Sequence, residues 1–305
     1  MKYLSCSLGV VLILASCAVA AENPVFKQLT EKGLEVSQGP AVQLPMPIMP
    51  DGLDAPGQRA AMEKVTDSRT SVNDMIRKSA SAPVMVKVRN VRTPEKEEGP
   101  VVRSIDVWFV IRGDWDKLIS EEFLQSIFGQ EDSKSQVVLK SGVLNAEELA
   151  KRNLTVVKKP DYEEQFPYVT FSLLERVQLS ATRFSVSTRQ EDSILAAGAI
   201  DPRFNTDPEY PNQWRAMLRD ERAEIKLGPP HLFAHGGGYA KITRLKNPAD
   251  AAFVECHIVY EEDYGWFDGA NLVKSKAPLM IQEKVRTFRR KLALASEKGD
   301  AKGEK

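Results

Sequence analysis

The sequence contains little histidine, little cysteine and no excess of either charge. Three histidines and three cysteines occur among 305 residues, and 42 basic residues balance 42 acidic ones. A protein dedicated to nucleic acid usually carries a clustered basic excess, so nucleic acid is not expected as a partner. The scarcity of histidine argues against a polynuclear metal centre. With 42% hydrophobic and 28% charged residues, the composition is that of a globular protein.

The apolar run near the N-terminus, from Leu8 to Ala21, is shorter than the about 20 residues that a membrane-spanning helix needs. It follows Lys2 and ends in small residues, a pattern typical of an export signal, predicted as residues 1–20. Cleavage after Ala18-Val19-Ala20 would release a soluble periplasmic or extracellular protein. Alternatively, Leu14-Ala15-Ser16-Cys17 has the pattern of a bacterial lipobox, in which Cys17 would be lipidated and would anchor the protein to a membrane. Both alternatives stay open.

Cys256 is the cysteine that stays unmodified in either case. A single cysteine cannot form an internal disulfide, so the core must hold the exported protein together. Cys256 lies in the apolar run Ala251–Tyr260, which favours a buried, inert thiol over a nucleophile.

The chain changes character near residue 82. Residues 21–81 are predicted to form an irregular N-terminal arm that wraps a larger body. Within it, Leu44–Pro50 alternates apolar residues with prolines, which indicates an extended strap, because proline fits neither a helix interior nor a central strand. Residues 82–297 are predicted as a single α+β domain, and the charged residues 298–305 as a frayed tail.

The larger body has the sequence pattern of an antiparallel sheet. Val84, Val86 and Val88 alternate with Met85, Lys87 and Arg89, the period of a strand. Val101–Ile111 becomes apolar on both faces and is predicted as a central strand. Short polar turns between the later strand patterns favour antiparallel neighbours.

The end of the chain has the pattern of a long amphipathic helix. Apolar residues recur there three or four positions apart, which places them on one helical face: Val273, Ala277, Ile281, Val285, Phe288 and Leu292. Pro278 is either a kink in this helix or its true first turn.

The segment that joins the last strand pattern to this helix reads Asp263-Tyr264-Gly265-Trp266-Phe267. A strand, a Gly-Trp turn and a long C-terminal helix over about residues 239–292 resemble the end of START-type lipid-transfer domains. The resemblance implies a helix-grip fold: α+β, with a curved antiparallel β-sheet packed against a long C-terminal α-helix and enclosing an apolar cavity. A hydrophobic small molecule or lipid would then be the partner.

In such a cavity, the sequence offers candidate wall and gate residues. Small and medium residues at strand positions, among them Ala196 and Ala240, would leave space that an apolar guest could fill. The candidates for the ligand pocket are Trp214, Tyr239, Trp266, Phe267, Ile281 and Val285. The candidates for a lid or gate are glycines, which absorb backbone change: Gly236, Gly237, Gly238 and Gly265.

Catalytic motifs are not found. His231 and His235 have the spacing of a helical zinc pair, but Pro229, Pro230 and the following glycines predict a loop. No G-x-S-x-G elbow occurs. No catalytic, cofactor or metal-binding residue is therefore assigned.

Three functions remain in order of preference. The first is an exported, non-enzymatic protein that binds a hydrophobic small molecule or lipid between sheet and helix. The alternative is a structural or interaction protein of the cell envelope with a solid core. The third is a hydrolase of unknown type. The sequence leaves the oligomeric state open.

Overall fold

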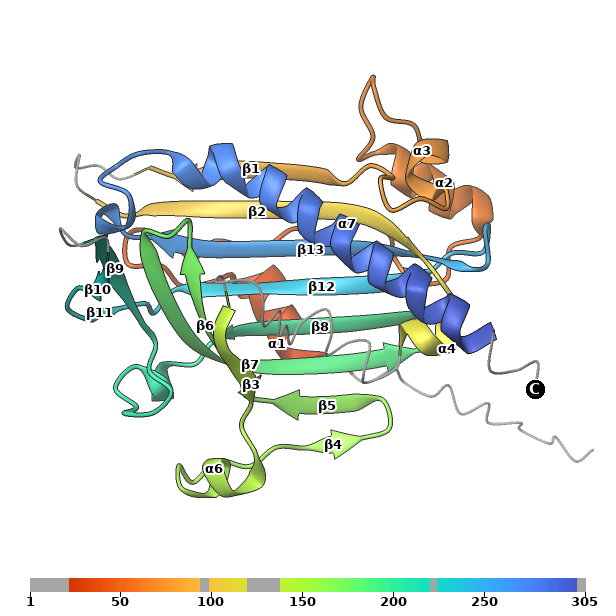
Figure 1. Ribbon diagram of the computed structural model, residues 1–305. Coiled ribbons are helices and arrows are strands. Elements are labelled where there is room, and N and C mark those ends of the chain that lie inside the picture. Colours follow the sequence, from red (N-terminus) through yellow and green to blue (C-terminus); the bar gives the residue numbers. More distant parts are fainter. Residues whose placement is uncertain (1–21, 94–98, 120–137, 220–223, 301–305) are drawn as a thin grey trace, which may run out of the picture.

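The computed structural model describes residues 22–93, 99–119, 138–219 and 224–300, and a large antiparallel sheet dominates it (Figure 1). Every strand pair in it is antiparallel. The main path of the sheet runs in this spatial order: β1 (Met85–Arg92), β2 (Val101–Arg112), β13 (Ala251–Glu262), β12 (Gly236–Arg244), β8 (Ser193–Ile200), β7 (Val177–Gln190), β5 (Tyr162–Gln165) and β4 (Lys158–Lys159).

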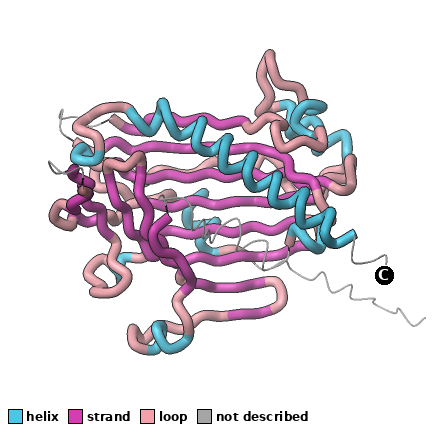
Figure 2. Tube along the Cα trace, viewed as in Figure 1, coloured by secondary structure: helices cyan, strands magenta, loops and turns pink. Residues whose placement is uncertain are grey.

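The sheet changes partners along its longest strand, β7. The first part of β7, Val177–Thr182, pairs with β6 (Pro167–Leu173) and β9 (Gln213–Arg219), whereas Arg183–Gln190 pairs with β8. The remaining strands extend the first group: β3 (Val138–Val143), β10 (Ile225–Leu227) and β11 (His231–Leu232). Figure 2 shows this group crossing one end of the main strands, so the sheet is curved rather than flat.

One long helix, α7 (Leu272–Asp300), lies diagonally across one face of the sheet (Figure 1). The six apolar residues of its predicted face all belong to or contact one hydrophobic cluster with β2 and β13, so the helical pattern is confirmed. Pro278 lies inside the helix, which therefore begins before it. We call this side of the sheet the helix face. The fold class predicted from the sequence, a curved antiparallel sheet against a C-terminal helix, is correct.

The N-terminal residues cover the opposite side, which we call the arm face. Their helices are α1 (Pro24–Lys27), η1 (Gln28–Lys32), α2 (Ala55–Glu63) and α3 (Val72–Ile76). One apolar cluster joins residues 49–75 to Trp108 and Phe253 of the sheet. Another joins residues 25–44 to Val186 and Tyr239. Because both faces are covered, β2 is buried from Val102 to Ile111, as expected for a central strand.

The other helical segments are short: α4 (Trp115–Leu118), α6 (Ala146–Ala150), η2 (Pro202–Phe204) and η3 (Tyr264–Trp266). Among the described residues, no helix is long and apolar enough to cross a membrane. The predicted export signal and Cys17 lie outside the described residues, as do residues 301–305 of the predicted tail.

Candidate functional site

The strand register determines which side chains share the helix face. Paired residues of antiparallel strands point to the same side, and every second residue along a strand does so too. A row of bulky side chains crosses the sheet at one level, with its first four members nearly inaccessible to solvent: Phe109, Val254, Ile242, Ile194 and Arg189. A second bounding row lies six residues further along the strands: Arg103, Tyr260, Gly236, Ile200 and Arg183.

Between these two rows the helix face carries mostly small side chains, with Ile258 as the large exception. We call this region the trough, and its floor consists of Cys256, Ile258, Gly238, Ala240, Ala196, Gly198, Ser185 and Ser187. Four adjacent strands supply these residues, so the floor is about 14 Å across at the usual spacing of strands. Glycine, alanine and serine side chains leave the floor low between taller neighbours.

The trough remains accessible although it lies at the centre of the sheet. Ile258 is 42% exposed on β13, an interior strand of the sheet, and Cys256, Ala196 and Ser187 are half-buried. On the arm face of the same strand, Glu255 and Val259 are buried. Helix α7 therefore covers the bulky side chains of the helix face and leaves part of the small ones open.

Five of the six predicted pocket residues lie together on the helix face side. Trp214, Trp266, Phe267 and Val285 are buried in the cluster beneath α7, and Ile281 packs against it half-buried. Trp266 stacks on Tyr260, at 6.0 Å between ring centroids, and so connects this cluster to the edge of the trough. The indole N–H groups of Trp214 and Trp266 are buried, and neither has a hydrogen-bond partner in the described part of the chain.

Tyr239, the sixth predicted pocket residue, lies on the arm face. Its hydroxyl donates a hydrogen bond to the carbonyl oxygen of Pro45 at 2.7 Å. Since side chains alternate along β12, Tyr239 points away from the side to which Gly238 and Ala240 point. The assignment of Tyr239 to a pocket under the helix is wrong for this reason.

Of the four glycines predicted as a gate, Gly236, Gly237 and Gly238 lie inside the sheet in β12, and Gly265 lies in the short helix η3. Gly237 and Gly238 pair with both β8 and β13, and Gly236 pairs with β13, so their backbone is held and not free to hinge. A Cβ on Gly238 would lie 2.5 Å from the carbonyl oxygen of His257, and one on Gly265 would lie 2.8 Å from the ring of Trp214. Close packing explains these glycines, and the predicted loop and gate at 236–238 are corrected accordingly.

Sequence reasoning missed Arg183, which ends the second bounding row on the helix face. Its Nε is buried and makes no hydrogen bond. Burial lowers the pKa of its guanidinium, and among the described residues no charged side chain pairs with it. Arg103, in the same row, instead forms a buried ion pair with Glu262 and donates to the side chains of Asn90 and Asn271. The sequence could have indicated this position, because every second residue of a strand shares a face, so Arg183 lies on the same face as Ser185 and Ser187.

The arm face holds a second polar group that the sequence did not reveal. His257 Nδ1 lies 2.8 Å from Asp106 Oδ1, and its Nε2 lies 3.7 Å from Glu255 Oε2. Burial alone would lower the pKa of His257, but the hydrogen bond with Asp106 and the two carboxylates outweigh it and raise that pKa. The backbone N–H groups of Ile48 and Met49 point at the Glu255 carboxylate, with N–O distances of 3.0 and 3.4 Å.

This arm-face group ties the strap to the sheet. Lys241 Nζ donates to the carbonyl oxygen of Met49 at 2.9 Å and forms an ion pair with Asp51. Among the described residues, no cluster of histidine, cysteine or carboxylate side chains has the arrangement of a metal site. The buried charges therefore hold the strap over the sheet through complementary side chains.

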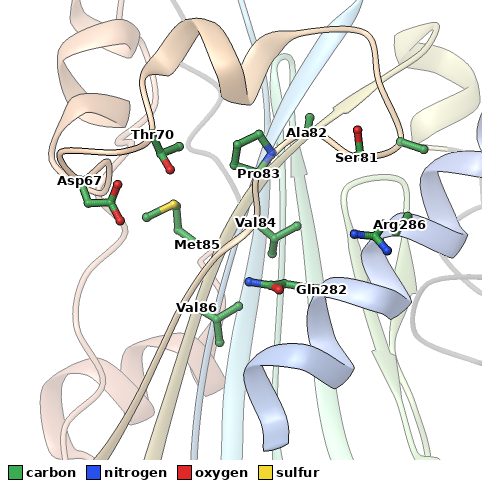
Figure 3. A pocket seen from close by; sticks show the side chains of 11 residues that line it. Asp67, Thr70, Ser81, Ala82, Pro83, Val84, Met85, Val86, Gln282 and Arg286 are labelled. Carbon is green, nitrogen blue, oxygen red and sulfur yellow. The ribbon is translucent and has the colours of Figure 1, made fainter. Parts of the chain in front are cut away.

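A further groove lies beside α7, between the helix and the segment that leads into β1 (Figure 3). It has a volume of about 360 Å³ and is open to solvent. Gln282 and Arg286 of α7 line one side, and Asp67 and Thr70 lie on the other. None of the predicted pocket residues lines this groove.

The fold is a curved antiparallel sheet with a long C-terminal helix across one face, and the mostly small side chains of the trough, part of them accessible to solvent, lie on that same face. No protein-family model matches the chain, and no curated protein matches it. Among solved structures, the chain is similar to human STARD10, a START domain, with a TM-score of 0.38 and 10% identity. The match covers 82% of this chain and 84% of that chain.

Proposed function

We propose that the protein binds a hydrophobic small molecule or lipid in the trough on the helix face. The observation that carries this proposal is the accessibility of Ile258, which lies at the centre of the sheet and yet is 42% exposed. A central strand normally buries such a side chain, and each Å² of apolar surface left open costs about 25 cal/mol. An apolar ligand would recover this free energy by covering Ile258 and the neighbouring alanines.

The shape of the trough supports an apolar occupant. Its floor consists of small side chains and its boundaries include Ile194, Ile242 and Tyr260, so a guest would be confined between taller walls. Binding sites for small molecules are usually concave and mostly apolar, with few polar groups that fix orientation. Ser185 and Ser187 supply such polar groups at the β7 side.

The groups near the trough favour binding without chemistry. Burial, together with the charge of Glu255, raises the pKa of the Cys256 thiol to about 12, so the thiol is protonated at neutral pH and is a poor nucleophile. His257, the nearest base along the strand, points to the arm face. A nucleophile and its base would have to lie on the same side to act together.

Filling the floor of the trough tests the proposal directly. We expect Ala196→Phe to weaken the binding of Nile red, a neutral apolar dye, by tenfold or more, because the ring would occupy the space above Ala240 and Ser187. The melting temperature should change little, since Ala196 is half-buried and faces the recess. Dye fluorescence titrations and thermal melts give the two measurements.

Leu279→Phe is the matched control, because Leu279 is 65% exposed on α7 and the change adds the same ring away from the trough. This variant should bind the dye as the unmodified protein does. If the unmodified protein takes up neither Nile red nor dodecanol, the trough is no ligand site and an interaction protein of the cell envelope becomes the better hypothesis.

We also propose that the protein is exported. Lys2 and the apolar run Leu8–Ala21 support this, and the two processing alternatives predict different masses. Mass spectrometry of the mature protein should find an N-terminus near Ala21 or a diacylated Cys17. An intact Met1 on cytoplasmic protein would overturn export.

A further inference from the structure

We infer that the ligand is an amphiphile with one acidic head, a carboxylate or a phosphate, and that Arg183 binds this head at the β7 end of the trough. The inference rests on the proposed function and adds the chemical class of the ligand. It also gives a reason for an arginine at position 183, since no interaction within the described part of the chain accounts for one there.

The position of Arg183 connects it to the trough. Arg183 pairs with Ile200 in the register of β7 and β8, and Ser185, the next helix-face residue along β7, belongs to the trough floor. The two helix-face positions are about 7 Å apart along the strand. The long arginine side chain can therefore bring its guanidinium to the end of the floor.

The unpaired state of Arg183 is the second observation. A buried guanidinium without a counter-charge or hydrogen bonds is costly, and such groups in native proteins are usually paired. Nε of Arg183 is buried and has no partner, and no carboxylate of the described residues forms an ion pair with it. Arg103 occupies the other end of the same row and is paired in the usual way, because it forms a buried ion pair with Glu262. The acidic head of a bound ligand would neutralise the guanidinium of Arg183 in the same way.

The chemistry of the guanidinium selects the head group. Its planar fork of N–H donors matches the two oxygens of a carboxylate or phosphate, and such bonds are stronger in a desolvated site. The rest of the floor, from Ala196 and Ala240 to Ile258, carries no charge. An anionic head at Arg183 would thus leave an apolar tail to lie across about 14 Å of small side chains.

Three probes with twelve-carbon chains, laurate, dodecyl phosphate and dodecanol, test the inference together with inorganic phosphate, which has no chain. Calorimetric titration of the unmodified protein, below micelle-forming concentrations, should show laurate or dodecyl phosphate binding about ten- to a hundredfold tighter than dodecanol. Which of the two anionic amphiphiles binds better distinguishes a carboxylate from a phosphate head. Inorganic phosphate alone should bind weakly, because it lacks the tail; binding as tight as that of dodecyl phosphate would overturn the amphiphile.

Arg183→Gln should remove the preference for the anionic probes and leave dodecanol binding unchanged. It should also raise, or at least not lower, the melting temperature of the ligand-free protein, because it removes a charge that has no partner among the described residues. Arg59→Gln is the control, since Arg59 is exposed on α2 of the N-terminal arm, on the opposite side of the sheet from the trough. This variant should keep the full preference.

The possible failures are distinguishable. If no probe binds to the unmodified protein, the proposed function itself fails. If dodecanol binds as tightly as laurate and dodecyl phosphate, or if Arg183→Gln keeps the preference, the trough is a neutral apolar site and the inference about Arg183 is wrong.

Discussion

Glu255→Gln is expected to lower the free energy of unfolding by roughly 3 kcal/mol, the lower end of the cost of removing one partner from a buried ion pair. Glu255 is fully buried, faces Nε2 of His257, and accepts hydrogen bonds from the strap. Glutamine keeps the shape and one acceptor oxygen but removes the charge. The effect stays at the lower end because Asp106 still pairs with His257. Urea denaturation at fixed pH measures the loss.

The dependence of this loss on pH identifies its cause. The raised pKa of His257 means that the stability from its protonated form is present below pH about 6.5 and declines as pH rises through the folded-state pKa. The difference between the unmodified protein and Glu255→Gln should therefore shrink as pH rises and His257 loses its proton. A loss that is constant from pH 5.5 to 8.5 would show that charge on His257 is not involved.

Glu261→Gln is the matched control for this experiment. Glu261 follows on the same strand and the same face, but its hydrogen bonds from Ser37 are exposed to solvent. Exposed interactions of this kind contribute about 0–1 kcal/mol. A loss in Glu261→Gln equal to that in Glu255→Gln would contradict the importance of burial.

Phe253→Ala should cost roughly 3–5 kcal/mol, because it leaves a cavity between the sheet and the N-terminal arm. Phe253 is 0% exposed on the arm face and belongs to the cluster that includes Met49, Met62 and Met75. All three methionines come from the arm, so the cavity would weaken the attachment of the arm as well as the core. The midpoint of urea denaturation should fall clearly, with the arm becoming more sensitive to protease.

Leu279→Ala supplies the comparison, since it removes an apolar side chain from an exposed position on α7. Its effect should stay within about 0.5 kcal/mol, as for most surface changes. If Phe253→Ala costs no more than Leu279→Ala, the arm is not packed on the sheet as described.

Much of the fold could be predicted from local patterns. The spacing of Val273, Ile281 and Phe288 is enough to assign the long helix and its buried side, because that pattern depends only on the helical repeat. The burial of Val102–Ile111 likewise follows from a run that is apolar on both faces. The strand at Gln213–Arg219 was missed, because Arg215 interrupts its short run of apolar residues and Arg219 ends it.

The site was harder to predict, because it depends on which residues meet across the sheet. Sequence reasoning found the aromatic side chains beneath the helix, Trp214 and Trp266 among them, since large aromatic residues near turns are conspicuous. It placed Tyr239 on the wrong face and took the neighbouring glycines for a gate. It also gave no indication that Arg183 would be without a partner while Arg103 would have one.

The sequence by itself determined the periods: which residues alternate along each strand, and which side of the last helix is apolar. Only the tertiary structure decided which face of the sheet the helix covers and which the arm covers. The central strands are apolar on both faces, so alternation alone does not show which face the helix covers and which the arm covers. The order β13-β12-β8-β7 then brings small residues from four separate strands into one trough. Partners such as Arg103 and Glu262, 159 residues apart, meet only through that order, because register between distant strands is not a local property.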